Sequence, residues 1–400
     1  MAPVITMLGS LPPIRGISSY CFELSREIAG QCQVQFISYK DNKIYPSFLY
    51  PGGDTTDNTF PSLSAPGLRI IPGLVWYNPF TWLKQALGNS GDILHAQWWS
   101  LPLFPIYVTV CLIFRLRKKP VILTVHNVLP HDSSPIFTMA SRVLFCLCNH
   151  FIVHTRINQK QLKQHYGIPD EKISVIPHGP LDFFHHQRAS SPLSLKDIQA
   201  IKTDLRLPLQ KKIMLVFGAV RPYKGLDTAL KALTYLISEN PHFGGHLLIA
   251  GKMWRDQHTY ETFIKENNLS DYVTIHPDYV PTDQVARFFT ISDLVLLPYR
   301  KFDSQSGVGT LATAFRKPMI VTQTGGLPDL VQNKSMVVQP GDWKRLADQI
   351  TYVLSDERIL KSMQRDADTT AQEISWKMIG AITVSIYQKC LDSGLYEKKD

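Results

Sequence analysis

The feature that most constrains this chain is an alternation of short, β-branched apolar runs with longer amphipathic stretches, which occurs twice along the sequence. Runs such as Val4–Leu8 and Val121–Val125 have the length and composition of buried strands, and the stretches between them have helical periodicity. Parallel strands are normally joined by such helical crossovers. The pattern therefore predicts an α/β protein with a parallel sheet in each half.

The strands expected in the first half share this apolar character: Val4–Leu8, Val34–Ile37, Leu68–Ile71, Ile93–Ala96, Val121–Val125, Phe151–Val153 and Ile173–Ile176. The helices expected there are amphipathic: Ile17–Ala29, Pro102–Arg117, Pro135–Cys148 and Arg156–Tyr166. The alternation restarts with strands at Ile213–Phe217, Leu247–Ala250, Val273–Ile275, Leu294–Leu297, Met319–Val321 and Met336–Val338. The last 60 residues have helical patterning and end in a helix at Trp376–Leu391.

At 400 residues the chain is longer than one hydrophobic core usually serves, so two domains are expected. Each half has the pattern of a Rossmann-like domain, in which ligands bind beyond the carboxyl ends of the strands. Two such halves facing each other would enclose a central cleft. We expect domains at residues 1–180 and 211–372, an irregular linker at 181–210, and a closing helix within 373–400.

Hydrophobic residues make up 44% of the chain and charged residues 19%, which is typical of a globular protein and not of a disordered or polytopic membrane protein. The formal net charge of +9 favours an anionic partner. Six cysteines are too few for a disulfide framework, so we expect reduced, mostly buried thiols and a cytoplasmic location. The N-terminus lacks the basic start of a secretory signal.

An uncharged run from Ala96 to Phe114 precedes the sharpest basic cluster of the sequence, at 115–119. Two prolines interrupt the run and expected strands flank it, so we interpret it as a buried crossover helix with a solvated basic end. The alternative is that the 98–114 segment also touches an anionic bilayer, which would place the protein peripherally on the inner membrane face.

The first candidate binding site follows the strand expected to end at Phe217. Gly218 comes next, and Arg221 and Lys224 follow before the next helix. A guanidinium fork and an ammonium group together suit the two charged groups of a diphosphate. The alternative is a pair of solvated surface cations, and we favour the binding site because Gly218 and Gly225 bracket the pair.

The second candidate follows the strand expected to end at Leu297. Its small-residue loop, Ser304–Gly307, precedes a helix expected at Leu311–Phe315, so backbone amides there could hold phosphate. Gly307–Ala312 weakly matches a dinucleotide fingerprint, but it lies late in its domain behind a loop, and NAD is not expected. The turn Thr324–Asp329 fits either a further ligand-side loop or a plain connection.

Polar residues also follow expected strands in the first half. Arg15 and Gly16 precede the first helix, where a cation and an open backbone can approach a ligand. His126 ends an expected strand, which makes a catalytic or substrate-positioning role as plausible as a structural one. His178 is expected in a hinge turn with a ligand-side role as the alternative.

Several other functions lack their motifs. The chain has no P-loop and no Gly-x-Ser-x-Gly nucleophile elbow. Asp366 and Asp368 fall in a polar helical stretch and predict a solvated face, so no metal site is expected. Aromatic and basic residues are not interleaved as in proteins that bind single strands, so no nucleic acid is expected as a partner.

These segments resemble glycosyltransferase family 4, whose members have the two-domain GT-B fold. The resemblance is strongest over residues 213–330 and is carried by Phe217–Gly225, Tyr279–Pro281, Ser292–Pro298 and Lys317–Asp329. In the first half, three segments are similar to the family's acceptor loop, active-site histidine and interdomain turn: Gly9–Gly16, Thr124–Asn127 and Ile176–Gly179. The helix from Trp376 is similar to one that packs back onto the first domain.

The resemblance implies a retaining glycosyltransferase that moves a sugar from a nucleoside-diphosphate-sugar to a saccharide or lipid-linked acceptor, in polysaccharide or glycoconjugate biosynthesis. The implied donor-binding residues are Arg221, Lys224, Gly225, Ser304, Gln305, Ser306 and Gly307. His126 and Asp303 would be catalytic, and Arg15 and Gly16 would lie on the acceptor side. The diphosphate itself would take the acceptor's proton, so no cofactor and no obligatory metal is implied.

One departure from the family concerns two acidic positions. The family usually has two glutamates with seven residues between them, and here those positions hold Asp303 and Leu311. The run Ser304–Gly307 resembles a subset of the family in which a Gln-Ser-Gly segment replaces the usual acidic-glycine turn. The contacts to the donor ribose and the role of Asp303 therefore stay open.

Three rival functions are kept beside the transferase. The same fold could serve a sugar-nucleotide epimerase or hydrolase. The lost second glutamate would also fit a non-catalytic sugar-nucleotide sensor. The pI of about 9.1 would fit a DNA binder or an enzyme that glucosylates DNA, for which steep salt-dependent DNA binding is expected.

Overall fold

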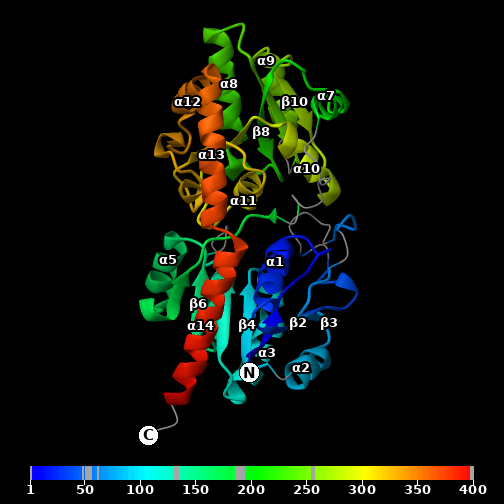
Figure 1. Cartoon of the computed structure of the whole chain (residues 1–400), viewed down its shortest axis with the longest axis vertical. Coiled ribbons are helices and arrows are strands. Elements are labelled where there is room, and N and C mark those ends of the chain that lie inside the picture. The colour runs from blue at the N-terminus through cyan, green and yellow to red at the C-terminus, as the bar shows by residue number, and fades with distance from the viewer. Residues whose placement is uncertain are drawn as a thin grey trace. The chain divides into compact units, whose positions relative to one another are not determined.

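The computed structural model describes residues 2–46, 49, 56–60, 63–89, 91–129, 135–182, 184, 194–253 and 257–396, with side chains to residue 392. The chain divides into two compact units (Figure 1). Unit 1 comprises residues 1–179 and 374–400, and unit 2 comprises residues 180–373. Each unit has its own parallel sheet.

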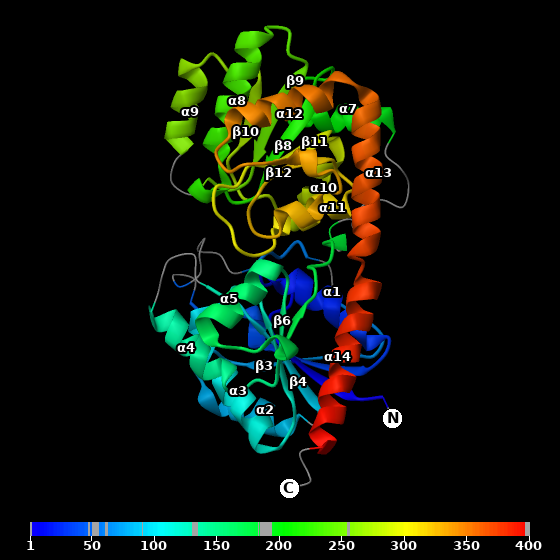
Figure 2. The ribbon, with the colours of Figure 1, turned by 90° about the vertical axis from the view of Figure 1, so that its left-hand side faces the viewer.

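Unit 1 has a seven-stranded sheet in the order β3-β2-β1-β4-β5-β6-β7. Its strands are β1 Val4–Leu8, β2 Gln33–Tyr39, β3 Leu68–Leu74, β4 Ile93–Trp98, β5 Val121–Val125, β6 His150–Val153 and β7 Ile173–Val175. Its helices are α1 Ser18–Ala29, α2 Pro79–Gly88, α3 Phe104–Leu116, α4 Pro135–Phe145, α5 Arg156–Tyr166 and α14 Trp376–Tyr396. Helices α1 and α14 pack together on one face of the sheet, and α2, α3 and α4 lie on the other (Figure 2).

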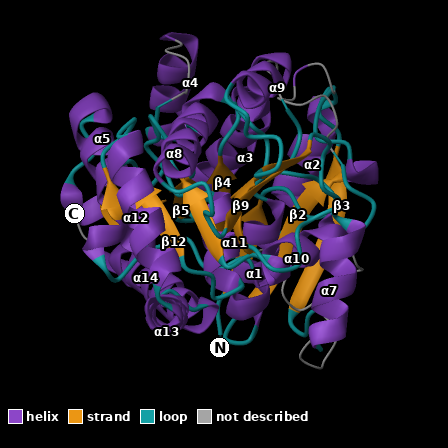
Figure 3. Cartoon of the chain, turned by 90° about the horizontal axis from the view of Figure 1, so that it is seen from above, coloured by secondary structure: helices purple, strands orange, loops and turns teal. Residues whose placement is uncertain are grey.

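Unit 2 has a six-stranded sheet in the order β10-β9-β8-β11-β12-β13. Its strands are β8 Lys212–Phe217, β9 Gly245–Ala250, β10 Val273–His276, β11 Leu294–Leu297, β12 Met319–Thr322 and β13 Val337–Val338. Its helices are α7 Leu195–Asp204, α8 Leu226–Glu239, α9 Gln257–Glu266, α10 Thr282–Ile291, α11 Gly307–Ala314, α12 Trp343–Ser355 and α13 Glu357–Glu373. Helices flank the strands on both sides (Figure 3).

The expected α/β class with parallel sheets is confirmed. The apolar runs form strands because they are covered on both faces: every residue of β4 and β5 is buried. In each sheet the strand order reverses once, between β1 and β4 in unit 1 and between β8 and β11 in unit 2. Ligands of such sheets bind beyond the carboxyl ends of the strands at these reversals. The loops after β1, β4, β8 and β11 are therefore the places to look for a site.

Three local expectations differ from the structure. The segment expected as an irregular linker contains α7, because Ser194 and Asp197 form a reciprocal capping box at its start. Helix α2 was not expected, although the side chain of Asn78 caps its first turn and proline follows. Helix α11 begins at Gly307, four residues before the expected Leu311, because Ser306 caps it.

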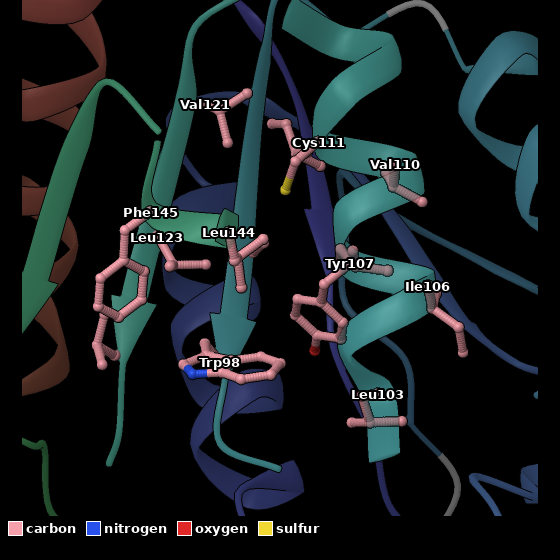
Figure 4. Packing of buried hydrophobic residues seen from close by; sticks show 14 of the residues in the cluster. Trp98, Leu103, Ile106, Tyr107, Val110, Cys111, Val121, Leu123, Leu144 and Phe145 are labelled. Carbon is pink, nitrogen blue, oxygen red and sulfur yellow. The ribbon is translucent and has the colours of Figure 1, made fainter. Parts of the chain in front are cut away.

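The apolar run before the basic cluster becomes the end of β4, a short turn and then α3. The inward face of α3 is fully buried and packs toward β4 and β5, as Figure 4 shows for Tyr107 and Cys111. At the basic end, the Arg117 guanidinium donates to the carbonyl oxygens of Ala86 and Asn89, which close the end of α2. Within the described residues, no helix has both the length and the hydropathy needed to span a bilayer.

The closing helix α14 belongs to unit 1. The hydroxyl of Tyr387 lies 2.6 Å from Nδ1 of His95 on β4, and both side chains are fully buried. Trp376, which is 5% exposed, packs against Gly179 so closely that a Cβ at that glycine would lie 2.6 Å from the indole ring. Residues of α14 therefore complete the hydrophobic core that residues 1–179 form in unit 1.

Trp376→Ala tests this completion. Removing a buried indole should lower the free energy of unfolding of unit 1 by about 3–5 kcal/mol. Denaturant unfolding followed by fluorescence would measure it. Ile382→Ala on the same helix, where the side chain is 37% exposed, is the control and should cost less than about 1 kcal/mol. Equal small losses in both variants would show that α14 contributes little to this core.

Candidate functional site

The loops that follow β8 and β11 meet in unit 2. Gly225, with a φ of +70°, lies against the carbonyl group of Pro298, and a Cβ at this glycine would be 1.9 Å from the carbonyl oxygen. Gly218, with a φ of +85°, lies between Lys224 and Val308, and a Cβ there would be 3.0 Å from Nζ of Lys224. Only glycine combines this conformation with such close approach, so these two positions bring the two loops together.

Lys224 is the buried cation of this site, with 8% of its surface exposed. Its Nζ donates a hydrogen bond of 3.2 Å to the carbonyl oxygen of Phe217, the last residue of β8, and lies 5.7 Å from the ring centre of Tyr299. Burial, with a further contribution from the charge of Arg221, lowers the pKa of Lys224 to about 8. A folded protein that keeps an ammonium group in this position is well suited to bind an anion.

Tyr299 connects this cation to the second predicted loop. Its hydroxyl lies 3.0 Å from Oγ of Ser306, and both side chains are buried. Oγ of Ser306 also accepts from the backbone N–H of Gly309, at 3.2 Å, and so caps α11. The structure thus places Lys224 near the ring, and Ser306 at the hydroxyl, of one tyrosine.

The loop before α11 is held from two further sides. The backbone N–H of Gly326, in the turn after β12, donates to the carbonyl oxygen of Ser304 at 3.0 Å. The side-chain oxygen of Gln305 accepts from the N–H of Ser306 at 3.0 Å. Gly307 is exposed at the first position of α11, where helix amides have no partner within the helix. Asp303 and Arg221 are half-buried beside these groups in sequence.

In unit 1, His126 follows directly after β5 and is 6% exposed. Its Nε2 lies 3.0 Å from the side-chain oxygen of Gln97, and its Nδ1 lies 3.3 Å from Nε2 of His154. Both ring nitrogens of His126 therefore face protein groups. Its ring also lies nearly perpendicular to the Tyr20 ring, with 4.9 Å between the ring centres.

Tyr20 is the centre of a cluster that the sequence analysis did not identify. His126, His154, His178 and Trp376 all lie with ring centres 4.7 to 5.4 Å from that of Tyr20. His154 was missed, yet it follows β6 just as His126 follows β5, and carboxyl ends of parallel strands share one edge. A histidine repeated at consecutive strand ends was the available signal.

Burial holds this cluster uncharged. It lowers the pKa of His154 to about 4 and that of His178 to about 3, the charge of His154 adding to the latter shift. The pKa of His126 is well below its ordinary value, first because of burial and then because of the neighbouring histidines. His126 therefore serves as a neutral hydrogen-bonding group at physiological pH.

Arg15 and Gly16 lie in the loop after β1, half-buried and exposed respectively. Ser18 donates to Ser10 at 2.8 Å across this loop, and Tyr20 follows two residues later on α1. The loop is thus joined through α1 to the histidine cluster. Among the described side chains, no group of three or more His, Cys, Asp or Glu residues is arranged to hold a metal ion.

All six cysteines are free thiols. Cys21, Cys32 and Cys111 are buried, whereas Cys146 is exposed and the other two are partly so. Only three of the six thiols are buried, whereas the sequence predicted that most would be. Cys146 is exposed because it lies just beyond the end of α4.

Comparison with known proteins agrees with this architecture. Residues 14–180 match the family described as Glycosyltransferase Family 4, and residues 197–372 match Glycosyl transferases group 1. The fold matches a glycosyltransferase of Rickettsia africae, with a TM-score of 0.71 and 17% identity over 98% of this chain and 99% of that one. It also matches HepE of Anabaena in complex with UDP, with a TM-score of 0.70 and 15% identity over 97% of this chain and all of that one.

Two parallel sheets of this kind, with loops of this kind at their reversals, define the GT-B class of glycosyltransferases. The chain belongs to glycosyltransferase family 4. A D-inositol 3-phosphate glycosyltransferase of Segniliparus rotundus is 25% identical over 62% of this chain and 53% of its own length. One of Corynebacterium aurimucosum is 23% identical over 74% and 71%. The chain thus matches little more than half the length of the first of these relatives.

The histidine cluster makes the stability of unit 1 dependent on pH. Histidines with lowered pKa values stay neutral in the folded state, while the unfolded chain takes up protons below about pH 6.5. The free energy of unfolding should therefore fall between about pH 6.5 and pH 4, by about 2 kcal/mol per buried histidine at pH 5. Denaturant titrations at pH 7, 6 and 5 measure this slope. His178→Gln should make the slope shallower, and an unchanged slope would contradict the assignment.

Lys224 adds a dependence of the same sign in unit 2, but at higher pH. Its lowered pKa means that the protonated side chain destabilises the fold below about pH 8, and that this cost fades toward pH 10.5. Lys224→Met should therefore raise the free energy of unfolding at pH 7 by about 2 kcal/mol and by less at pH 10. Lys231→Met, at an exposed position of α8, should change neither value. A Lys224→Met protein that is less stable at both pH values would refute the prediction.

Proposed function

We propose that the chain is a retaining glycosyltransferase that moves a sugar from a nucleoside-diphosphate-sugar to a saccharide or lipid-linked acceptor. The observation that carries the proposal is the buried ammonium of Lys224, joined through Tyr299 to the capped amino end of α11 at the β8/β11 reversal. A buried cation next to helix amides is an arrangement that binds phosphate groups.

The donor side follows from these groups. Arg221 and Lys224 would neutralise the diphosphate as negative charge develops on it, and Ser304–Gly307 would donate hydrogen bonds to the same phosphates. Gly225 would let the backbone approach them closely. Asp303 at the start of the loop and Gln305 within it are the polar candidates for contacts to the sugar or ribose. HepE of Anabaena has been crystallised with UDP and with UDP-glucose, which supports this class of donor.

The proposed reaction needs no metal and no separate base. The bond between the sugar and the diphosphate breaks, the acceptor oxygen bonds to the same face of the sugar, and a diphosphate oxygen takes the acceptor's proton. The negative charge that develops on the leaving group contributes most to the activation free energy. Fixed cations stabilise this charge and so lower the activation free energy without a metal ion.

On the acceptor side, His126 would hydrogen-bond the transferring sugar by exchanging Gln97 for a sugar hydroxyl at Nε2. Its neutral state is suited to this exchange. Arg15 and Gly16 would contact the acceptor. Relatives named as D-inositol 3-phosphate glycosyltransferases support an anionic or hydroxyl-rich acceptor. The setting that we propose is polysaccharide or glycoconjugate biosynthesis, in the cytoplasm or peripherally on the inner membrane face.

Donor binding and turnover test the proposal. Calorimetry with a panel of UDP-, GDP- and ADP-sugars identifies the donor, and turnover is then measured with that donor. Lys224→Ala should lower turnover about a hundredfold or more, because a charge that stabilises the leaving group is lost. Lys231→Ala, an exposed cation on α8, is the matched control and should be unaffected. Near-normal turnover of Lys224→Ala, or sugar release that needs no acceptor, would overturn the proposal.

A further inference from the structure

Exposed apolar side chains gather on one part of unit 1. Of the sixteen large hydrophobic residues exposed within the described residues, nine lie between residues 77 and 143. Eight of these are on α2, α3 and α4, the three helices that cover one face of the sheet: Phe80, Leu83, Leu87, Leu112, Leu116, Ile136, Met139 and Val143. We call the surface that these eight residues form the α2–α4 face.

The spacing of these residues shows that they form stripes and are not scattered. Phe80, Leu83 and Leu87 are three and four residues apart on α2, and so lie along one side of the helix. Ile136, Met139 and Val143 repeat the same spacing on α4. Helix α3 packs against both α2 and α4, so the stripes belong to one layer (Figure 2).

These outward stripes are separate from the residues that build the core. On α3, Ile106, Tyr107 and Val110 are fully buried (Figure 4), whereas Leu112 and Leu116 are 43% and 74% exposed. On α2, Phe80 is 81% exposed. An exposed apolar surface of this extent is uncommon on a protein that remains free in water and marks a surface for a partner.

The charge of the layer indicates which partner. Helices α2, α3 and α4 contain no aspartate and no glutamate. Their exposed charges are all positive: Lys84 lies between Leu83 and Leu87, Arg115 precedes Leu116, and Arg142 precedes Val143. By contrast, α13 in unit 2 carries acidic and basic residues together. Apolar side chains interspersed with cations suit an interface with anionic lipid headgroups.

The layer also has a place for an acyl chain. A hollow of about 500 Å³ opens between the start of α3 and α4, and every residue that lines it is apolar, Phe104, Ile136 and Met139 among them. A second copy of the chain fits the same face less well. Symmetric pairing would bring Lys84, Arg115 and Arg142 of one copy close to those of the other without an acidic partner in these helices.

We infer that the α2–α4 face docks unit 1 onto an anionic lipid bilayer, with the apolar stripes in the interface and the cations at the headgroups. This goes beyond the proposed transfer reaction and does not depend on it. The membrane contact is thus made by exposed residues of three helices. The 98–114 segment as a whole does not make it, because most of its residues are buried or half-buried.

Co-flotation of the full chain with vesicles tests the inference. The chain should bind vesicles of phosphatidylcholine with one third phosphatidylglycerol, bind pure phosphatidylcholine much less, and lose affinity as salt is raised. Replacing Phe80, Ile136 and Met139 together by serine should reduce binding at least about tenfold. Lys84→Gln and Arg142→Gln should each reduce it about fivefold on anionic vesicles. Leu195→Ser, at a position 80% exposed on α7, is the control and should bind as the unchanged chain does.

Three outcomes would overturn the inference. The first is binding by the triple serine variant equal to that of the unchanged chain. The second is equal affinity for neutral and anionic vesicles. The third is the absence of vesicle binding together with a concentration-dependent dimer that the triple variant abolishes, which would assign the face to a second copy. Lys224→Ala should float with vesicles normally, so a failure of the proposed reaction stays distinguishable from a failure of docking.

Discussion

The carbonyl oxygen of Pro298 lies where a side chain at position 225 would begin, and the arrangement of unit 2 around its candidate site depends on this contact. With glycine at 225, the loop after β8 can lie directly against the loop after β11. Lys224 is then enclosed between the Phe217 carbonyl and the Tyr299 ring, and Tyr299 reaches Ser306 at the start of α11. The strand reversal puts both loops at one edge, and the glycine lets them touch.

The two units use burial in opposite ways. Unit 2 keeps an ammonium group charged in a place where water is largely excluded, and its lowered pKa reflects the cost of doing so. Unit 1 instead packs three imidazoles around Tyr20, and burial keeps them neutral. For the proposed reaction this division is useful. The leaving diphosphate requires fixed positive charge, whereas a sugar hydroxyl is bound better by neutral donors and acceptors that do not compete for the diphosphate.

Much of the fold could be predicted because strand length, β-branching and helical period are local properties, and Val121–Val125, Leu294–Leu297 and Arg156–Tyr166 have the expected bounds. The glycines beside Lys224 could be recognised as well, since their spacing follows a strand end. Tyr299 could not, because its role comes from contacts with two loops that are separate in sequence. The bond between His95 and Tyr387 joins residues 292 positions apart, and no local pattern reports such a pair. Helices α2 and α7 had capping signals whose weight became clear only once their packing was known.

Helix α14 packs in unit 1, although it is synthesised after unit 2, and this affects the order in which the two units can fold. Residues 180–373 form a contiguous unit, so they can reach their final packing while synthesis continues. Residues 1–179 leave the ribosome before residues 374–400, so their core lacks Trp376 and Tyr387 until the intervening unit has been synthesised. During that interval Tyr20 lacks its contact with Trp376, and His95 lacks its partner Tyr387. Synthesis of unit 1 therefore starts before that of unit 2, whereas its packing is completed after unit 2 has been made.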